Sequence, residues 1–235
     1  MLLEFEHIEL RIKERLLFKS EPIQLTKGLV ALVGRNGTGK STFLNTIVDI
    51  RHDLANKIII HQRKLSEYNN RQLSKVISVV YSKSQVFGEH TVNDVLLLGR
   101  TPYLNPLSGY SKADREMVSK VSDLLGIQSL REQNFNALSD GERQMVMLGR
   151  ALVQDTDIIV LDEPTAFLDV VNKQRILELL AHLSKSKLIL FSSHQVGLLV
   201  KLCDQLLLID QQRLNLYTQP TEFQEVIENA FQIQL

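Results

Sequence analysis

The sequence has one cysteine, no excess of either charge and no long apolar run, and each of these features excludes a class of protein. The single cysteine, Cys203, rules out an internal disulfide framework and suits a reducing compartment. It lies in the apolar run 198–203, which favours a buried, inert thiol. Twenty-seven basic residues balance twenty-seven acidic ones, so no overall field attracts nucleic acid or an anionic membrane.

The distribution of apolar residues also disfavours a membrane-spanning or exported protein. No apolar stretch approaches the roughly 18 residues that would span a bilayer. The N-terminus carries charges where a signal peptide needs an apolar block. We therefore expect a cytoplasmic protein, whose association with a membrane has to come through a partner. At 235 residues the chain can bury one large core, or a core with a smaller appended lobe.

A glycine-rich stretch stands between an apolar run at 29–33 and a segment with helical spacing of apolar residues. The alternative to a phosphate-binding loop is an ordinary glycine turn, but the flanking strand and helix favour the loop and hence a nucleotide site. Glycines let backbone N–H groups converge on phosphate oxygens, and the following helix points its N-terminus at the same anion. The stretch consists of Gly34, Arg35, Asn36, Gly37, Thr38, Gly39, Lys40, Ser41 and Thr42.

Within this loop two side chains have expected roles toward a nucleotide. Lys40 adds a positive charge for the β- and γ-phosphates, and Ser41 offers a hydroxyl to Mg²⁺. A second landmark is the apolar strand 158–161, which ends in Asp162 and Glu163. Asp162 is placed to hold Mg²⁺ directly or through water, and Glu163 can polarise a water for attack on the γ-phosphate. The alternative is a strand that ends in a solvated acidic turn.

A third landmark is the stretch 138–144, at the head of a predicted helix that runs to about Val153. Ser139 and Glu142 have the spacing of a capping box, so the stretch by itself indicates no more than a well-capped helix. The phosphate-binding loop and the paired acids shift this interpretation toward a functional site.

Together the motifs resemble those of a known family, the ATP-binding subunits of ABC transporters. The resemblance covers residues 29–194, and the stretch 99–104 is further similar to the subgroup that imports iron–siderophore, haem and cobalamin complexes. In the family's order, the matching motifs are the Walker A loop (34–42), the signature sequence (138–144), the Walker B strand (158–163), the D-loop (166–169) and the switch histidine (192–194).

The resemblance implies how the residues act. In the family two subunits face each other head to tail, and ATP lies between one Walker A loop and the other subunit's signature. Ser139, the backbone N–H of Gly141 and the helix start at Glu142 would then meet the γ-phosphate held by the partner. His194 would bond the γ-phosphate and position Glu163 and the attacking water, rather than be a structural histidine. Residue 169, an aspartate, would lie at the dimer interface as well as cap the helix that follows.

The resemblance also implies the fold class, which is an α/β P-loop NTPase of the ABC-ATPase type. We expect a single domain, 1–235, with a RecA-like core and antiparallel β lobe (1–81 and 155–235) and a helical insertion (86–154). The alternation of Ile8, Leu10 and Ile12 predicts a strand, and the opposite parity of Leu3 and Phe5 predicts a bulge or twist near residues 6–7. With the segment near residue 60, these strands are expected to form the antiparallel lobe.

Other patterns complete the expected fold. Further strands are predicted at 58–60, 76–81, 187–191, 205–209 and 213–217. Capping spacings at Thr91 and Ser111 open two helices of the insertion, and Gly126 closes the second. Two prolines and a glycine make 101–110 a loop.

The sequence departs from the family's pattern at four places. Ser82 stands where a glutamine is usual, and Gln85 comes three residues late; Ser82 can still be a ligand of Mg²⁺, with a shorter reach. Asp140 replaces a glycine of the signature and brings a carboxylate near the γ-phosphate. Gly149 replaces an alanine, at a helix-propensity cost of about 1 kcal/mol. No aromatic residue aligns with the one that stacks on adenine; Phe18 is a weak candidate that we assign to the core.

The sequence as a whole therefore predicts an ATP-hydrolysing subunit of an importer. It would use ATP and Mg²⁺, form a homodimer, and dock on membrane-spanning permease subunits at the cytoplasmic face of the membrane. A groove made by 82–99 would receive the permease, a substrate-binding protein would take part indirectly, and no nucleic acid is expected as a partner. Two rivals remain open: a soluble ABC ATPase of a cytoplasmic machine, and a nucleotide-sensing module with weak hydrolysis.

Overall fold

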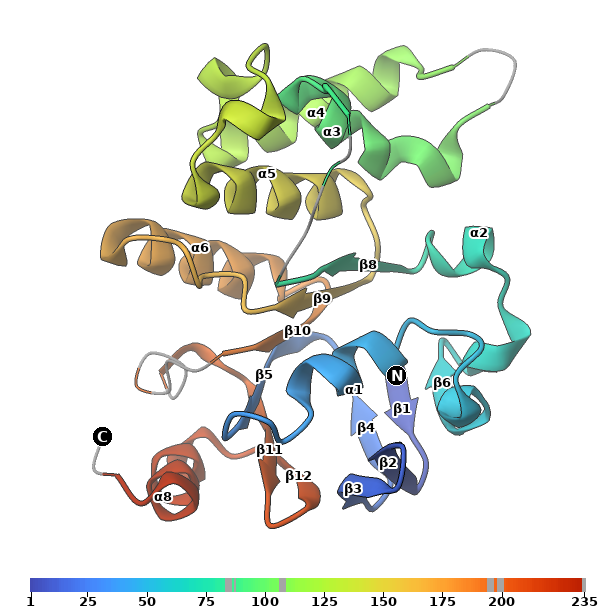
Figure 1. Ribbon diagram of the computed structural model, residues 1–235, viewed down its shortest axis with the longest axis vertical. Helices are drawn as coiled ribbons and strands as arrows, with labels where there is room; N and C mark the ends of the chain where they lie inside the picture. The colour runs from blue at the N-terminus through green and yellow to red at the C-terminus, as the bar shows by residue number, and fades with distance from the viewer. Residues whose placement is uncertain (83–85, 87, 106–108, 194–196, 198–200, 234–235) are drawn as a thin grey trace.

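The structure is a computed structural model that describes residues 1–82, 86, 88–105, 109–193, 197 and 201–233. The strands of this part of the chain form one sheet of eight strands and one of four (Figure 1). No helix within the described residues has both the length and the apolar character to cross a membrane.

The large sheet carries the strands that end at the candidate site. Its order is β2-β3-β12-β11-β5-β10-β9-β8. The five strands from β11 to β8 in this order are all parallel to one another. The strands are β2 (Ile8–Ile12), β3 (Arg15–Ser20), β5 (Gly28–Gly34), β8 (Ile77–Val80), β9 (Ile158–Asp162), β10 (Leu188–Ser192), β11 (Gln205–Asp210) and β12 (Arg213–Tyr217).

The small sheet is antiparallel, in the order β4-β1-β6-β7. Its strands are β1 (Leu3–Phe5), β4 (Ile23–Leu25), β6 (Ile58–Ile60) and β7 (Arg63–Lys64). It packs beside α1, where the rings of Phe5 and Phe43 lie 5.0 Å apart between centroids. The predicted contact between the first strand and the segment near residue 60 is confirmed, since Leu3 pairs with Ile60.

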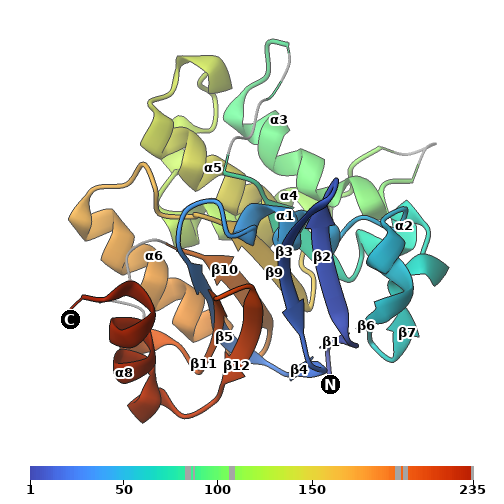
Figure 2. The same cartoon turned by 60° about the horizontal axis from the view of Figure 1, so that its bottom comes forward.

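Helices cover both faces of the large sheet, and Figure 2 shows α6 and α8 on one side of its strands and the small sheet on the other. The α-helices are α1 (Lys40–Thr46), α2 (Asn70–Leu73), α3 (Val92–Leu97), α4 (Lys112–Leu125), α5 (Asp140–Val153), α6 (Val170–Leu183) and α8 (Pro220–Phe231). The 3-10 helices are η1 (Asp53–Lys57), η2 (Leu65–Glu67), η3 (Leu98–Tyr103), η4 (Gln128–Leu130) and η5 (Phe135–Ala137).

Strand β5 shows how the sequence builds two core layers from one buried run. Its side chains alternate, so Leu29 and Val33 face the layer formed with α3 to α6 and α8. Val30 and Leu32 face the opposite layer, formed with α1 and the small sheet. Because both faces are covered, the strand is apolar throughout, which is why it carries no alternation in the sequence. The loop that follows it is thereby anchored at a buried strand end.

The predicted helix boundaries of the insertion are confirmed by their caps. Thr91, Ser111 and Ser139 each accept a hydrogen bond from the third backbone N–H of their helix, and each makes a complete capping box. Gly126 ends α4 with a φ of 70°, a left-handed conformation. The division of the chain into lobes at 81, 86 and 154 stays a prediction.

Two expectations for the fold are wrong. No bulge joins β1 to β2; the chain leaves the small sheet after Phe5 and enters the large one at Ile8, so the change of parity is a change of sheet. The β2–β3 pair accordingly belongs to the large sheet, and its register shift lies between Leu10 and Arg11. The segment 101–110 is also not a loop throughout, because η3 continues to Tyr103 with Pro102 inside it.

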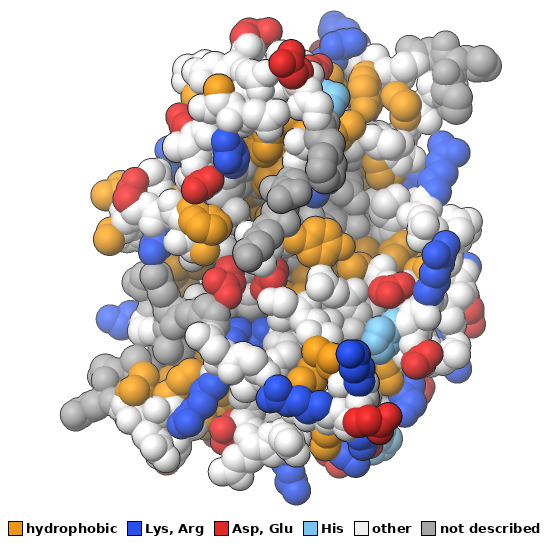
Figure 3. Space-filling model, viewed as in Figure 1, with side chains coloured by type: hydrophobic (Ala, Val, Ile, Leu, Met, Phe, Trp, Pro, Cys, Tyr) orange, Lys and Arg blue, Asp and Glu red, His pale blue; other side chains and the backbone are white. Residues whose placement is uncertain are grey.

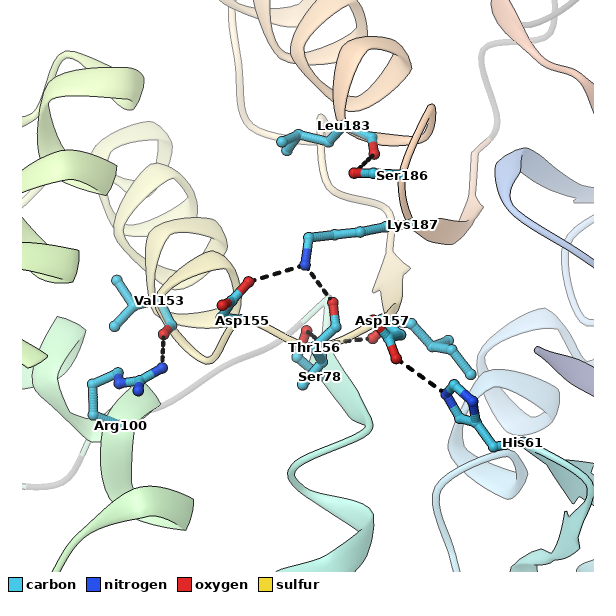
Figure 4. Close-up of polar contacts among 11 residues, drawn as sticks. His61, Ser78, Arg100, Val153, Asp155, Thr156, Asp157, Leu183, Ser186 and Lys187 are labelled. Atoms are coloured by element: carbon cyan, nitrogen blue, oxygen red, sulfur yellow. Dashed lines mark hydrogen bonds and ion pairs between the residues drawn. The ribbon is translucent and has the colours of Figure 1, made fainter.

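Polar contacts hold the N-terminal ends of β8, β9 and β10, at the edge opposite the paired acids (Figure 4). Lys187 donates to the Asp155 carboxylate at 3.0 Å and to the carbonyl of Thr156 at 2.7 Å. The Thr156 hydroxyl donates to the Ser78 hydroxyl at 3.0 Å, and His61 lies 3.4 Å from Asp157. These contacts tie together the starts of the three parallel strands.

Close backbone packing between η3 and α5 gives a first testable prediction, for Gly99→Ala. A Cβ built at Gly99 would lie 2.3 Å from the carbonyl oxygen of Arg150, and backbone cannot move aside as a side chain can. We expect a loss of about 2 kcal/mol or more in unfolding free energy, measured by urea denaturation. Gly149→Ala, at the neighbouring contact of α5 with α3, is the matched control. Its Cβ would meet a leucine methyl, Leu96 Cδ2, at 2.8 Å, and the gain in helix propensity opposes that strain. A stability of Gly99→Ala equal to that of the control would contradict the packing argument.

Candidate functional site

The loop between β5 and α1 has the backbone geometry of a phosphate cradle. Gly37 and Gly39 have φ angles of 76° and 105°, which a residue with a Cβ rarely adopts. The Lys40 ammonium donates to the carbonyls of Gly34 at 2.7 Å and Arg35 at 3.2 Å, and it is 6% exposed. Burial lowers the pKa of Lys40, and the nearby charges of Glu163 and Asp162 partly offset that shift. The loop thus holds its lysine folded over itself, within reach of an anion.

A pocket of about 460 Å³ opens on this loop and brings together residues far apart in the sequence. Glu163 lines it together with Lys40, Ser41 and Thr42, so the structure places the predicted base beside the predicted phosphate site. The opposite wall comes from the β2–β3 hairpin. The residues of the pocket are Ile12, Arg15, Leu17, Asn36, Gly37, Gly39, Lys40, Ser41, Thr42 and Glu163.

The paired acids at the end of β9 are held by a serine that the sequence reasoning gave no role. Ser192, at the end of the neighbouring strand β10, is opposite Asp162 in the parallel register. Its hydroxyl donates to Asp162 Oδ1 at 2.6 Å and accepts from the backbone N–H of Glu163 at 2.9 Å. Glu163 has a φ of 52°, a left-handed conformation that costs a non-glycine residue about 1 kcal/mol or more. Ser192 therefore fixes the orientation of one acid and the backbone of the other.

Ser192→Ala should expose this positioning role. The substitution leaves the Asp162 carboxylate, 5% exposed, without its hydroxyl donor, so we expect a loss of about 2 kcal/mol in unfolding free energy and a fall in ATP turnover. Turnover and urea denaturation measure the two effects. Ser78→Ala is the matched control: its hydroxyl is also buried in the large sheet, but its partner is Thr156 at the opposite edge. Ser78→Ala should lose some stability and keep its ATP turnover. If Ser192→Ala has the same ATP turnover as Ser78→Ala, Ser192 has no positioning role.

At the head of α5, the hydroxyl of the signature serine, Ser139, is already hydrogen-bonded within its own chain. The Ser139 hydroxyl donates to Glu142 Oε2 at 2.7 Å and accepts from the Glu142 N–H at 3.4 Å. These bonds and the Ser139 N–H lower the pKa of the Glu142 carboxyl. Asp140 lies 3.3 Å from Arg143, which offsets its charge at the surface. To donate to a phosphate, the Ser139 hydroxyl has to leave the Glu142 carboxylate.

A second pocket, of about 690 Å³, lies at this helix head. Ser139, Gly141 and Glu142 line it together with Phe167 and Asp169, and none of its lining residues belongs to the phosphate-loop pocket. Figure 1 places α5 in the upper half of the molecule and the loop before α1 in the lower half. One chain therefore holds the two halves of the predicted ATP site apart.

Asp169 has the capping function that its position predicted. Its carboxylate accepts from the backbone N–H of Asn172 at 2.8 Å and from the Asn172 side chain at 2.8 Å, at the start of α6. These hydrogen bonds lower the pKa of Asp169. Phe167, Val170 and Val171 beside it are exposed apolar side chains, with exposed fractions of 54%, 77% and 77%. The segment therefore combines a capped helix start with exposed apolar side chains.

Other predicted site residues have different outcomes. Ser82 follows β8 at the same sheet edge as Asp162, because Val80 pairs with Leu161, and it is partly exposed. His194 and Gln85 lie outside the described residues. Phe18 is 0% exposed and packs edge-on against Phe43, which confirms its assignment to the core.

The oxygen donors near the phosphate loop suit a Mg²⁺ ion that binds together with a nucleotide. No group of three or more histidine, cysteine or acidic side chains that could hold a metal occurs in the described part of the chain. Mg²⁺ bound with a nucleotide needs few protein oxygen ligands, because it keeps waters and phosphate oxygens. The hydroxyls of Ser41 and Ser82 and the Asp162 carboxylate would supply such ligands.

The family of the chain follows from a match to known sequences. A family model described as ABC transporter matches residues 24–166, which include the phosphate loop and both acids. The chain belongs to the ABC transporter family. It is therefore a nucleotide-binding protein of the ATP-hydrolysing kind, and the predicted P-loop fold of the ABC-ATPase type is confirmed.

Individual ABC relatives agree with this assignment. The achromobactin transport ATP-binding protein CbrD of Dickeya dadantii is 32% identical over 190 residues, 80% of this chain and 71% of that protein. The molybdate import ATP-binding protein MolC of Haemophilus influenzae is 30% identical over 202 residues, 85% of this chain and 75% of that protein. An inward-facing structure described as a metal-chelate type ABC transporter has a TM-score of 0.84 at 26% identity, covering 99% of this chain and 90% of that chain.

Proposed function

We propose that this chain is the ATP-hydrolysing subunit of an ABC importer for a metal-chelate cargo, of the iron–siderophore, haem or cobalamin type. The observation that carries the hydrolytic part is the pocket that gathers the phosphate loop, Lys40 and Glu163. The cargo class is supported by the relative named for achromobactin and by the metal-chelate type structure. The relative named for molybdate makes an oxyanion the cargo to test against it.

The residues divide the work of hydrolysis between binding, metal and base. The loop 34–42 binds the triphosphate, and Lys40 exchanges its two carbonyl partners for phosphate oxygens. Ser41, Asp162 and Ser82 would hold Mg²⁺ through their oxygens, and the ion would supply positive charge against the phosphates. Glu163 polarises the attacking water, and Ser192 orients both acids. His194 is assigned to the γ-phosphate by the family resemblance alone.

The active form is a homodimer in which each ATP contacts both copies. The separation of the two pockets within one chain supports this arrangement, since Ser139 and Gly141 line no part of the phosphate-loop pocket. In the dimer these residues reach the γ-phosphate on the partner's loop, and the exposed Phe167 and Asp169 lie against the partner.

The proposed dimer works on integral membrane permease subunits, at the cytoplasmic face of the membrane. A substrate-binding protein delivers the cargo to the permease and makes no contact with this chain. Recognition of the cargo therefore belongs to other subunits, and nucleic acid has no part in the cycle.

Uptake in the native cell tests the function. Glu163→Gln in the chromosomal copy should abolish energy-dependent uptake of one radiolabelled cargo among ferric siderophores, haem, cobalamin and molybdate, while uptake through an unrelated carrier continues. Loss of molybdate uptake alone would replace the proposed cargo. Normal uptake of all four, with the variant protein present at wild-type amount, would contradict an import function for the chain.

A further inference from the structure

Around the end of β8 the chain presents an apolar surface that carries positive charge. We call it the β8-end surface and define it by Tyr81, Leu98, Tyr103, Lys75 and Arg150. Tyr81 and Leu98 are each 43% exposed, which is high for large apolar side chains. In Figure 3 hydrophobic side chains gather in the hollow between the upper helices and the lower strands, with basic side chains along its right-hand rim.

Arg150 is the unusual member of this surface. It lies in the last turn of α5, and its Nη2 donates to the carbonyl of Val79 on the edge strand β8 at 3.2 Å. Its Nε is buried and has no hydrogen-bond partner within the described residues. Burial lowers the pKa of Arg150, and the nearby Tyr81 partly offsets that shift. Among the described residues, one carbonyl accepts from this guanidinium, which has five N–H donors.

Three acidic side chains on segments next to α5 already have basic partners. Asp114 accepts from Arg100 at 2.7 Å, and both side chains are mostly buried. Asp155 lies 3.0 Å from Lys187, and Asp157 lies 3.4 Å from His61 (Figure 4). No ion pair with a carboxylate reaches Arg150 in the part of the chain that the structure describes. Its charge is thus desolvated without the anion that normally accompanies such burial.

The position of Arg150 is held rigidly from both sides. The backbone of Gly99 packs on the Arg150 carbonyl so closely that a Cβ would lie 2.3 Å from it. Beyond Gly99, the Tyr103 ring lies between Arg100, at 4.1 Å from its centroid, and Lys75, at 5.5 Å. The surface is therefore pre-organised, and a partner that docks on it meets a fixed cation bordered by exposed apolar side chains.

We infer that the permease segment that docks on this chain inserts an aspartate or glutamate at Arg150, flanked by apolar side chains that cover Tyr81 and Leu98. The inference rests on the proposed function, because it takes the occupant to be the membrane subunit. A carboxylate matches the guanidinium fork in geometry and compensates its buried charge, whereas an apolar segment alone would bury Arg150 further without a partner. Neighbouring Lys75 is exposed and raises the local positive potential, which favours the same sign of partner.

Site-specific photocrosslinking in the native cell tests this partner chemistry. Leu98 is replaced with p-benzoylphenylalanine in the full chain, and the crosslinked peptide is sequenced by mass spectrometry. We expect a peptide of an integral membrane subunit with an aspartate or glutamate within about one helical turn of the crosslink. Arg150→Gln should lower the crosslink yield by about tenfold or more, because the loss of one member of a desolvated charge pair weakens docking. Lys75→Gln, which removes an exposed charge from the same surface, should change it by less than about twofold.

Separate experiments test whether the Arg150 variants are folded and whether Arg150 pairs with the partner's acid. Magnesium-ATP binding and the melting temperature establish that Arg150→Gln is folded, and Arg150→Lys, which keeps the charge without the fork, should give an intermediate yield. Arginine in place of the partner's acid, combined with Arg150→Glu, should restore crosslinking. A membrane peptide without an acid, a yield unchanged by Arg150→Gln, or a crosslink to a second copy of this chain would each overturn the inference. A crosslink to no membrane protein at all would instead count against the proposed function.

Discussion

Glu163→Gln is expected to lower ATP turnover by about 100-fold or more while the protein continues to bind ATP. The carboxylate lines the phosphate-loop pocket, and its backbone is fixed by Ser192. The amide keeps the size of the side chain but cannot polarise water for attack. Since it also removes a negative charge beside the phosphates, ATP affinity should stay the same or rise. Steady-state phosphate release and equilibrium binding of labelled ATP measure the two quantities.

The matched control is Glu225→Gln, which removes an exposed carboxylate from α8. Glu225→Gln should leave both ATP turnover and ATP binding unchanged. That result would show that the change in net charge does not cause the loss of turnover in Glu163→Gln. With hydrolysis blocked, Glu163→Gln should also accumulate as an ATP-bound dimer, seen by light scattering. Turnover at the wild-type rate in Glu163→Gln would refute the assignment of the base.

Lys40→Ala and Ser139→Arg are each expected to abolish turnover, for different reasons. Without Lys40 the loop loses a buried ammonium in the phosphate pocket, and ATP affinity should fall by about 100-fold or more. An arginine at 139 blocks the helix head in the second pocket and should leave ATP binding to the isolated chain unchanged. Equilibrium binding of labelled ATP separates the two defects.

Because the proposed site takes its loop from one copy and its helix head from the other, the two inactive variants should complement each other. In a mixed dimer one site carries both defects and the other carries none, so an equimolar mixture should recover roughly a quarter of the wild-type turnover. Phosphate release from the mixture is the readout, and each variant alone at the same total concentration is the control. A mixture as inactive as its components would contradict a shared site.

The sequence predicted the parts of the site whose determinants are local. The phosphate loop needs glycines at the left-handed positions 37 and 39, and those glycines are visible in the sequence. The caps at Ser139 and Asp169 depend on residues three positions apart and were predicted for the same reason. The end of a buried strand at Asp162 is also a local pattern.

The features that sequence reasoning missed depend on residues that meet only in the folded chain. Ser192 is 29 and 30 positions from the two acids it bonds, and only the parallel register of β9 and β10 brings them together. The sequence did offer one signal for this contact. Ser192 is a polar residue at the end of an apolar strand, as Asp162 is. The switch of sheets after Phe5 has the same parity pattern as a bulge, so alternation alone gave the wrong interpretation.

Packing explains why residue 149 is a glycine where the family usually has an alanine. Helix propensity gave only the cost of that glycine. Gly149 costs helix propensity, but a Cβ there would press on Leu96 and Leu125 at 2.8 and 3.1 Å. The glycine thus lets α5 lie close to α3 and α4, a distance that only the tertiary structure shows. Likewise, Ile12, Arg15 and Leu17 line the far side of the phosphate-loop pocket, and none of them is aromatic.

The central claim is that one ATP is held by the loop of one copy and the helix head of another. The most direct test is the structure of Glu163→Gln with magnesium-ATP. The account predicts the Ser139 hydroxyl within about 3 Å of a γ-phosphate oxygen whose nucleotide lies in the partner's loop 34–42, with its bond to Glu142 broken. ATP bound in that loop with Ser139 remote from every triphosphate, in all pairings of chains, would contradict it.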